Sequence, residues 1–298
     1  MAVIQVRQLT KRFGAVTAVD QLSFELGSGV TGFLGPNGAG KTTTLRMLLG
    51  LVRPTSGQAT LWGSRYADLG GRRHQVGAVL EASGFHPGRM VRDHLRVRCA
   101  ACGLPRSRVD EVLDATGMAA LASRRAGNLA LGERQRLGLA GALLADPEVL
   151  ILDEPGNGLD PAGVTWLRGF LRQLGGQGRT VLVSSHMLAE VAQTADEVIV
   201  IDRGRLVSHA PVGQLLAGAR QVVAVRTGQA AELREVLESE GARVRVIAAD
   251  RLEISGLTTE HVATVAAERR LPLFEISVQA ESLEDAFLRV TSPAGRPR

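Results

Sequence analysis

The pattern of apolar and polar residues changes its period several times along the chain. Apolar runs predict strands at 2–9, 21–26, 58–63, 74–81, 148–155 and 180–186, and a strand hairpin at 197–207. Residues 30–51 read as a strand, a glycine-rich turn and a helix, and helical spacing continues over 88–145, 161–176 and 187–195. Because strands alternate with helices, we predict an α/β fold with a mostly parallel sheet covered on both faces.

The pattern changes again from about residue 216. Residues 221–280 read strand, helix, strand, strand, helix, strand, which is the order of a ferredoxin-like α+β domain. A short helix at 282–290 precedes a tail rich in Pro, Gly and Arg that we expect to be disordered. We therefore predict two domains, 1–215 and 216–298. The second carries no catalytic constellation and is expected to serve dimerisation or regulation.

Composition restricts the class of protein. The chain has 298 residues, of which 45% are hydrophobic and 22% charged, as in soluble globular proteins with room for one large and one small domain. No apolar run reaches the roughly 18 residues of a membrane span. The start of the chain alternates polar and apolar residues and has no signal-peptide core, so we expect a cytoplasmic protein.

The charge balance favours no particular partner. A net charge of +5 and a pI near 10.1 are compatible with nucleic-acid binding. The cations are almost all scattered arginines, however, and lysine occurs only at positions 11 and 41, so direct nucleic-acid binding is not expected. Cys99 and Cys102 are too few for a zinc site, and we interpret them as neighbours on one helix face.

The glycine-rich turn carries the clearest chemical signal. "GPNGAGKT", residues 35–42, fits G-x-x-x-x-G-K-[ST] after an apolar strand and before a helix. Glycines allow successive backbone N–H groups to face phosphate oxygens, and the helix N-terminus adds positive potential. Lys41 is expected to reach the β and γ phosphates of ATP, and the Thr42 hydroxyl to ligate Mg²⁺. The predicted nucleotide-binding residues of this turn are Gly35, Asn37, Gly38, Ala39, Gly40, Lys41, Thr42 and Thr43.

An acidic pair ends the apolar strand "VLILDEP". Asp153 fits a carboxylate on the magnesium side, and Glu154 fits a base that polarises the attacking water. An acidic pair at a strand end is also what a solvated loop entry looks like. The phosphate-binding turn makes the catalytic interpretation the favoured one.

Several motifs in a fixed order resemble the nucleotide-binding subunits of ABC transporters, over roughly residues 2–212. The resemblance implies a P-loop NTPase core with a helical subdomain at about 85–145. It places "LALGE", 129–133, as the signature motif that contacts the nucleotide of a second copy through Leu131, Gly132 and Glu133. It makes "GNGLD", 156–160, the D-loop, with Asp160 at the dimer contact.

The same resemblance assigns two further side chains. His186 stands where the family has its switch histidine at the γ-phosphate, and Phe13 where an aromatic ring stacks on adenine. Apart from this resemblance, a histidine that follows a strand is more often a structural residue packed against its neighbours.

Two positions depart from the family pattern. Ala130 replaces the serine whose hydroxyl donates to the opposing γ-phosphate, which predicts a weakened clamp unless Arg134 or Arg136 compensates. Glu81 replaces a glutamine at the loop that senses Mg²⁺, and a carboxylate can still ligate the ion. Glu81, "NGLDPAG" and the C-terminal domain resemble the bacitracin- and daunorubicin-resistance type of bacterial drug-export ATPases.

The resemblance implies an ATP-hydrolysing motor subunit that drives efflux of a hydrophobic small molecule or antibiotic. Its partners are a second copy of itself and separately encoded membrane permease subunits, and its place is the cytoplasmic face of the bacterial membrane. A groove at 82–105, including Phe85, His86, Pro87 and Met90, is expected to receive a helix of the permease, although these residues also suit an ordinary helical surface.

Two alternatives remain open on sequence alone. ABC-type ATPases that act on nucleic acid or ribosomes usually carry two nucleotide domains or a long coiled coil, and this chain has one motif set and no heptad run. A silent subunit that binds ATP without hydrolysing it is favoured only by Ala130. The presence of Lys41, Asp153, Glu154 and His186 argues against it.

Overall fold

The computed structural model describes residues 2–80, 84–187, 191–217 and 221–280. The chain divides into two compact units, Met1–Val212 and Gly213–Arg298. The predicted helices at 187–195 and 282–290 and the predicted tail lie partly or wholly outside the described residues. Among the helices that are described, none is both long and apolar enough to cross a membrane.

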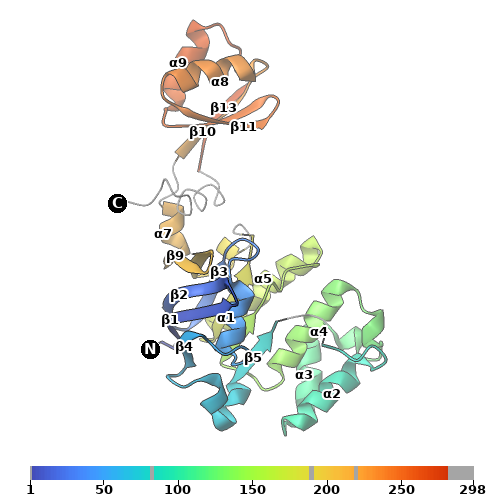
Figure 1. The fold of residues 1–298 in the computed structure, drawn as a ribbon. Coiled ribbons are helices and arrows are strands. Elements are labelled where there is room, and N and C mark those ends of the chain that lie inside the picture. The colour runs from blue at the N-terminus through green and yellow to red at the C-terminus, as the bar shows by residue number, and fades with distance from the viewer. Residues whose placement is uncertain (1, 81–83, 188–190, 218–220, 281–298) are drawn as a thin grey trace. The chain divides into compact units, whose positions relative to one another are not determined.

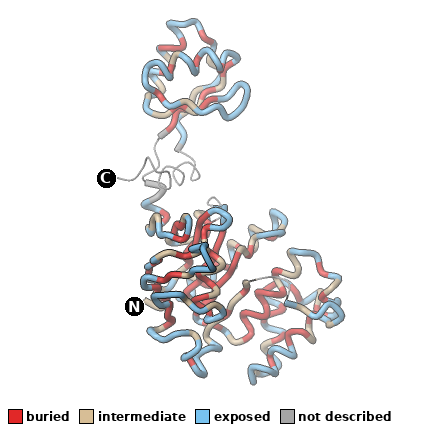
Figure 2. The backbone as a smooth tube through the Cα atoms, viewed as in Figure 1, coloured by how far each residue is buried: buried red, intermediate tan, exposed pale blue. Residues whose placement is uncertain are grey.

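A six-stranded sheet forms the centre of the first unit (Figure 1). Its order is β5-β6-β7-β3-β8-β9, and all neighbours are parallel except the β8–β9 hairpin. The strands are β3 (Gly29–Leu34), β5 (Val76–Val79), β6 (Val149–Leu152), β7 (Thr180–Ser185), β8 (Glu197–Asp202) and β9 (Arg205–Pro211). Every residue of β6 and β7 is buried, as a sheet covered on both faces requires (Figure 2).

A second, antiparallel sheet has the order β2-β1-β4. Its strands are β1 (Ile4–Phe13), β2 (Val16–Leu26) and β4 (Ser56–Leu61). Helix α1 (Lys41–Leu48) shares one hydrophobic core with this sheet and with one face of the central sheet, and α5 (Pro161–Gly176) covers the other face. The phosphate-binding turn between β3 and α1 therefore starts from a strand that is packed on both sides.

The helical subdomain contains α2 (Val91–Ala101), α3 (Ser107–Ala115) and α4 (Leu131–Leu143). Short 3₁₀ turns lie at Tyr66–Asp68, Gly70–Gln75, Ala119–Leu121 and Ala126–Asn128. The prediction that Cys99 and Cys102 are neighbours on one helix face is wrong. Cys99 is buried in α2, whereas Cys102 follows the end of that helix and is exposed.

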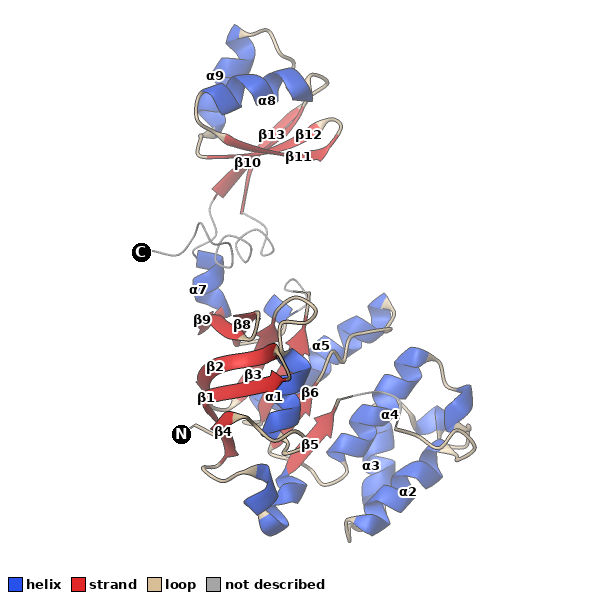
Figure 3. Cartoon of the chain, viewed as in Figure 1, coloured by secondary structure: helices blue, strands red, loops and turns tan. Residues whose placement is uncertain are grey.

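The second unit has the predicted ferredoxin-like topology (Figure 3). Its elements are β10 (Gln221–Arg226), α8 (Ala230–Ser239), β11 (Arg243–Ala248), β12 (Arg251–Ser255), α9 (Thr259–Glu268) and β13 (Glu275–Ala280), preceded by α7 (Val212–Ala217). The strands pair antiparallel in the order β11-β12-β10-β13. Both helices pack on one face of this sheet, where Val223, Leu233 and Val262 share a core.

Candidate active site

The turn between β3 and α1 has a backbone that only glycine accommodates at two points. Gly40 adopts a left-handed conformation at φ 102°, and a Cβ added there would lie 2.4 Å from the carbonyl oxygen of Ala18. A Cβ added at Gly35 would lie 2.4 Å from the carbonyl oxygen of Ile201. Neighbouring strands thus hold both ends of the turn by direct backbone contact.

The positions between these glycines differ in exposure. Asn37 and Gly38 are exposed, Ala39 is buried, and Thr43 is half-buried in the first turn of α1. The open rim of the turn is formed by Pro36, Asn37 and Gly38, all three of which are exposed.

Lys41 is buried at the centre of the turn, with 6% of its side chain exposed. Its Nζ donates to the carbonyl oxygen of Gly35 at 2.6 Å and lies 3.2 Å from Oε1 of Glu154. A buried ammonium requires such partners because isolated burial of a charge is costly.

Asp153 follows β6 and is hydrogen-bonded through both carboxylate oxygens. Its Oδ2 accepts from the Thr42 hydroxyl at 2.6 Å, and its Oδ1 accepts from the Ser184 hydroxyl at 2.5 Å. Two hard oxygen ligands from different elements therefore lie side by side, as a Mg²⁺ site needs. Sequence reasoning missed Ser184, whose only signal is that it is one of two serines at the end of the strand Thr180–Ser185.

Glu154 has an unusual backbone for its residue type. Its φ is +48°, a left-handed conformation that costs free energy for a non-glycine residue and that clusters at functional sites. Its amide donates to the Ser184 hydroxyl at 2.9 Å, which helps to hold this conformation. The same serine thus orients both carboxylates of the acidic pair.

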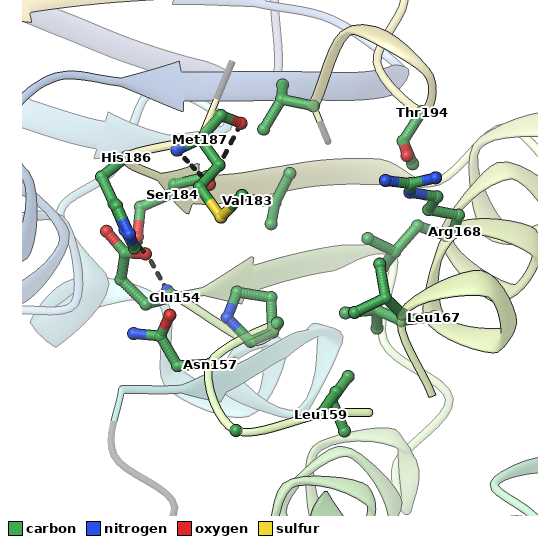
Figure 4. Close-up of a pocket in the computed structure, with 17 residues that line it drawn as sticks. Glu154, Asn157, Leu159, Leu167, Arg168, Val183, Ser184, His186, Met187 and Thr194 are labelled. Atoms are coloured by element: carbon green, nitrogen blue, oxygen red, sulfur yellow. Dashed lines mark hydrogen bonds and ion pairs between the residues drawn. The ribbon is translucent and has the colours of Figure 1, made fainter. Parts of the chain in front are cut away.

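The Glu154 carboxylate lies between the side chains of Lys41 and His186. Oε1 faces Lys41 Nζ, and Oε2 lies 2.8 Å from Nδ1 of His186 (Figure 4). His186 follows β7, so three segments far apart in sequence meet at this carboxylate. The structure therefore brings together the predicted phosphate-binding lysine, the predicted base and the predicted switch histidine.

Phe13, the residue predicted to stack on adenine, is exposed. The Phe13 ring ends β1 with 51% of the residue exposed, and Lys11 Nζ lies 4.8 Å from its centroid. An exposed ring next to a cation offers one free face to a planar ligand.

Comparison with known proteins agrees with this geometry. A family model described as ABC transporter matches residues 19–157, and a model described as a domain of unknown function matches 221–284. The chain is 40% identical over 217 residues to the bacitracin transport ATP-binding protein BcrA of Bacillus licheniformis, covering 72% of this chain and 71% of that protein. It is 32% identical to BcrA of Enterococcus faecalis over 300 residues, covering 98% and 97% of the two chains.

This chain belongs to the ABC transporter ATP-binding family. It is accordingly an ATPase subunit of a transporter, and members of the family hydrolyse ATP to power transport. Solved structures confirm the fold. The ATP-binding subunit of an ABC transporter matches with a TM-score of 0.66 at 24% identity, covering 72% of this chain and 92% of that one. The cbiO1 protein of Clostridium perfringens, part of the ABC transporter complex cbiONQ, matches with a TM-score of 0.65 at 26% identity, covering 79% and 94%.

The predicted signature segment, 129–133, lies at the start of α4. Ala130 is the N-cap residue, and its amide donates to Oε2 of Glu133 at 2.8 Å. This is half of a capping box, because an alanine methyl cannot accept the reciprocal hydrogen bond from the Glu133 amide. Leu131 is 53% exposed, and a Cβ added at Gly132 would lie 3.1 Å from Leu159.

The two arginines next to the signature are engaged elsewhere. Arg134 donates from Nε to the carbonyl oxygen of Leu129 at 3.1 Å and from Nη2 to that of Gly127 at 3.2 Å. Arg136 lies over the ring of Trp166, 4.3 Å from its centroid. The idea that either arginine replaces the missing serine hydroxyl therefore finds no support within the chain.

Asp160 begins α5. Its Oδ1 accepts from the amide of Gly163 at 2.7 Å, so the carboxylate caps this helix in the single chain. Glu81 lies outside the described residues.

The groove residues divide into two kinds. Phe85 packs against the core of the helical subdomain and meets the ring of His94 edge-on, with centroids 5.0 Å apart. Burial, with smaller effects of Arg98 and Arg89, lowers the pKa of His94 to about 4. His86 and Pro87 are exposed, and Met90 is 45% exposed. Because Phe85 packs against a core, a substitution such as Phe85→Asp would perturb folding as well as permease docking. The exposed Met90 is therefore the better position at which to test docking by mutation.

Proposed function

We propose that this subunit powers an exporter that expels a hydrophobic small molecule or antibiotic through separately encoded membrane subunits. The observation that carries the proposal is the Glu154 carboxylate, positioned between Lys41 and His186 and next to Asp153. One of the two relatives whose names concern bacitracin transport matches both units of the chain, since its alignment covers 98% of it.

ATP is proposed to bind with its phosphates along residues 35–43 and its base on Phe13. Lys41 leaves Glu154 and neutralises the β and γ phosphates. Thr42 and Asp153 would hold a Mg²⁺ ion through their side-chain oxygens, and Glu81, the third predicted ligand, lies outside the described residues. When bound, the ion neutralises phosphate charge and orients the γ-phosphate.

Glu154 is then free to accept a proton from the attacking water. His186 already lies within hydrogen-bond distance of that carboxylate, so it orients the base and, with ATP present, contacts the γ-phosphate. Ser184 holds Asp153 and Glu154 in fixed relative positions through its hydroxyl. The chain thereby supplies a phosphate anchor, two metal ligands and a base.

Two copies are proposed to close head-to-tail, with 129–133 of one copy over the nucleotide of the other. Within one chain, the described residues of 129–133 make no hydrogen bond or ion pair with 35–42. Backbone amides at Gly132 and the N-terminus of α4 face the phosphate in this arrangement, without the hydroxyl that Ala130 lacks. The clamp is weakened, not lost.

The protein is proposed to sit on the cytoplasmic face of the membrane, with the exposed rim of His86, Pro87 and Met90 against the permease. The second unit is proposed to be an accessory domain for dimerisation or regulation.

The test is antibiotic susceptibility of a strain that lacks the gene. We expect increased susceptibility to hydrophobic antibiotics, bacitracin among them, and rescue by the native gene but not by Glu154→Gln. Rescue by Glu154→Gln equal to the native gene contradicts an ATP-driven exporter. Unchanged susceptibility, with loss of uptake of a nutrient, contradicts the direction of transport.

A further inference from the structure

A cavity of about 260 Å³ lies directly behind the catalytic pair. Helix α5, the end of β7 and the loop after Glu154 line it (Figure 4). Its walls are apolar over most of their extent. The apolar lining side chains are Pro155, Leu159, Val164, Leu167, Leu171, Val183, Met187 and Val191.

The two ends of the cavity differ in charge. Glu154 and His186 lie at one end, and the guanidinium of Arg168 lies at the other (Figure 4). An anionic ligand group is repelled by the carboxylate of Glu154 and attracted by Arg168, so the cavity has one preferred orientation for an acid.

Arg168 carries an unsatisfied donor. Its Nη1 donates to Oε1 of Gln193 at 2.6 Å, but its Nε is buried and has no hydrogen-bond partner among the described residues. A buried N–H without an acceptor is unfavourable, and an ionised donor gains more from an acceptor than a neutral one does. Since Arg168 lines the cavity, its positive charge favours a ligand that brings an anionic oxygen to this end.

We propose that the cavity is a binding site for a small amphipathic carboxylate, with the carboxylate on Arg168 and an apolar tail over Leu167, Leu171 and Val183. Drug-sized ligands occupy pockets of about 300–1,000 Å³, so this volume suits a shorter molecule of about ten non-hydrogen atoms. A straight-chain acid such as octanoate has that size and shape.

The site also has a consequence for turnover. Glu154, His186 and Leu159 form part of the cavity wall, whereas none of residues 35–43 does. A bound acid therefore restrains the base and the loop 156–160 without competing for the phosphates. It lowers the kcat of ATP hydrolysis and leaves the KM for ATP unchanged.

The experiment titrates octanoate into the nucleotide-free, full-length protein by isothermal calorimetry. We expect one saturable site, with octan-1-ol binding at least tenfold more weakly because it lacks the charge. Arg168→Gln is expected to weaken octanoate binding at least tenfold, and Val164→Phe to weaken it by filling the cavity. Should Arg168→Gln fail to fold, Val164→Phe decides alone, and unchanged octanoate binding by that variant overturns the proposal.

Arg172→Gln is the matched control. Arg172 lies on the same helix, is exposed, makes its own contact with Gln193 and does not line the cavity. Octanoate binding within twofold of the native protein is expected for this variant. The proposal is overturned by absence of saturable binding, by equal binding of octan-1-ol, or by a loss in Arg172→Gln equal to that in Arg168→Gln. Because binding is measured without ATP, its failure is separate from any failure of the exporter proposal.

Discussion

Restoring a hydroxyl at the start of α4 tests the interpretation of the signature segment in two ways. Ala130 is the N-cap, and no side chain caps the amides of the first turn. In Ala130→Ser the new Oγ accepts from the Glu133 amide and completes the box whose other half already exists at 2.8 Å. An N-cap serine contributes about 1 kcal/mol relative to alanine, which raises the Tm of a domain of this size by about 2–4 °C.

The same hydroxyl can donate its proton while its oxygen accepts from the amide. In the closed dimer the donor reaches the γ-phosphate held by the other copy. A hydrogen bond to a charged group contributes about 1.5–3 kcal/mol, and 1.4 kcal/mol is a tenfold change in affinity. The closed dimer of two identical copies contains this contact twice, so we expect the ATP-dependent dimer of Ala130→Ser to form at roughly hundredfold to ten-thousandfold lower protein concentration.

Two assays separate these effects, with Ala120→Ser as the control. Ala120 is an exposed position of the same subdomain, so the control adds a hydroxyl outside the signature. Thermal unfolding reports the cap, and ATP hydrolysis measured against protein concentration reports the dimer. If the Tm rises but the dependence of ATP hydrolysis on protein concentration is unchanged, the phosphate contact is refuted and the N-cap hydrogen bond is supported. No change in either refutes both.

Three further outcomes follow from the site and its surroundings. Lys41→Ala is expected to weaken binding of a fluorescent ATP analogue at least tenfold, and an affinity within twofold of the native protein contradicts its role. Asp153→Asn should raise the Mg²⁺ concentration needed for half-maximal hydrolysis at least tenfold; an unchanged requirement argues against the metal assignment. For His94, whose folded pKa of about 4 lies below the usual 6.5, the unfolded chain binds the proton first, so stability falls as pH drops from 6.5 towards 4. At pH 5 this loss is about 2 kcal/mol relative to pH 7.5, and denaturant unfolding of His94→Leu should lack that part of the dependence.

The sequence predicted the parts of the site that are local in the chain. Motif spacing predicted the turn at 35–42, and that turn favoured the catalytic interpretation of the acidic pair, because both motifs are contiguous and follow a strand. The left-handed Glu154 and the role of Ser184 could not be predicted, since both depend on contact between β6 and β7. The orientations of the Arg134 and Arg136 side chains could not be predicted either, because they depend on contacts that form only in the folded chain.

Strand boundaries were least predictable where the backbone is irregular. The predicted strands 2–9 and 21–26 are observed as Ile4–Phe13 and Val16–Leu26. Gln8 and Gln21 both have positive φ, and the pairing register shifts near them. Such bulges break the alternation on which a sequence-based boundary rests. The helix predicted at 161–176 is observed as α5 with the same bounds; in the structure Asp160 caps its start and Pro161 occupies the first turn.

The most direct test of the account compares steady-state MgATP hydrolysis by the native protein and by Glu154→Gln, with ATP binding measured on both. We expect measurable turnover by the native protein, and a rate at least a hundredfold lower for Glu154→Gln with ATP affinity retained. A native protein that binds ATP without hydrolysing it, or a Glu154→Gln variant that hydrolyses at the native rate, would contradict the central claim that this carboxylate is the base of an ATP-driven motor.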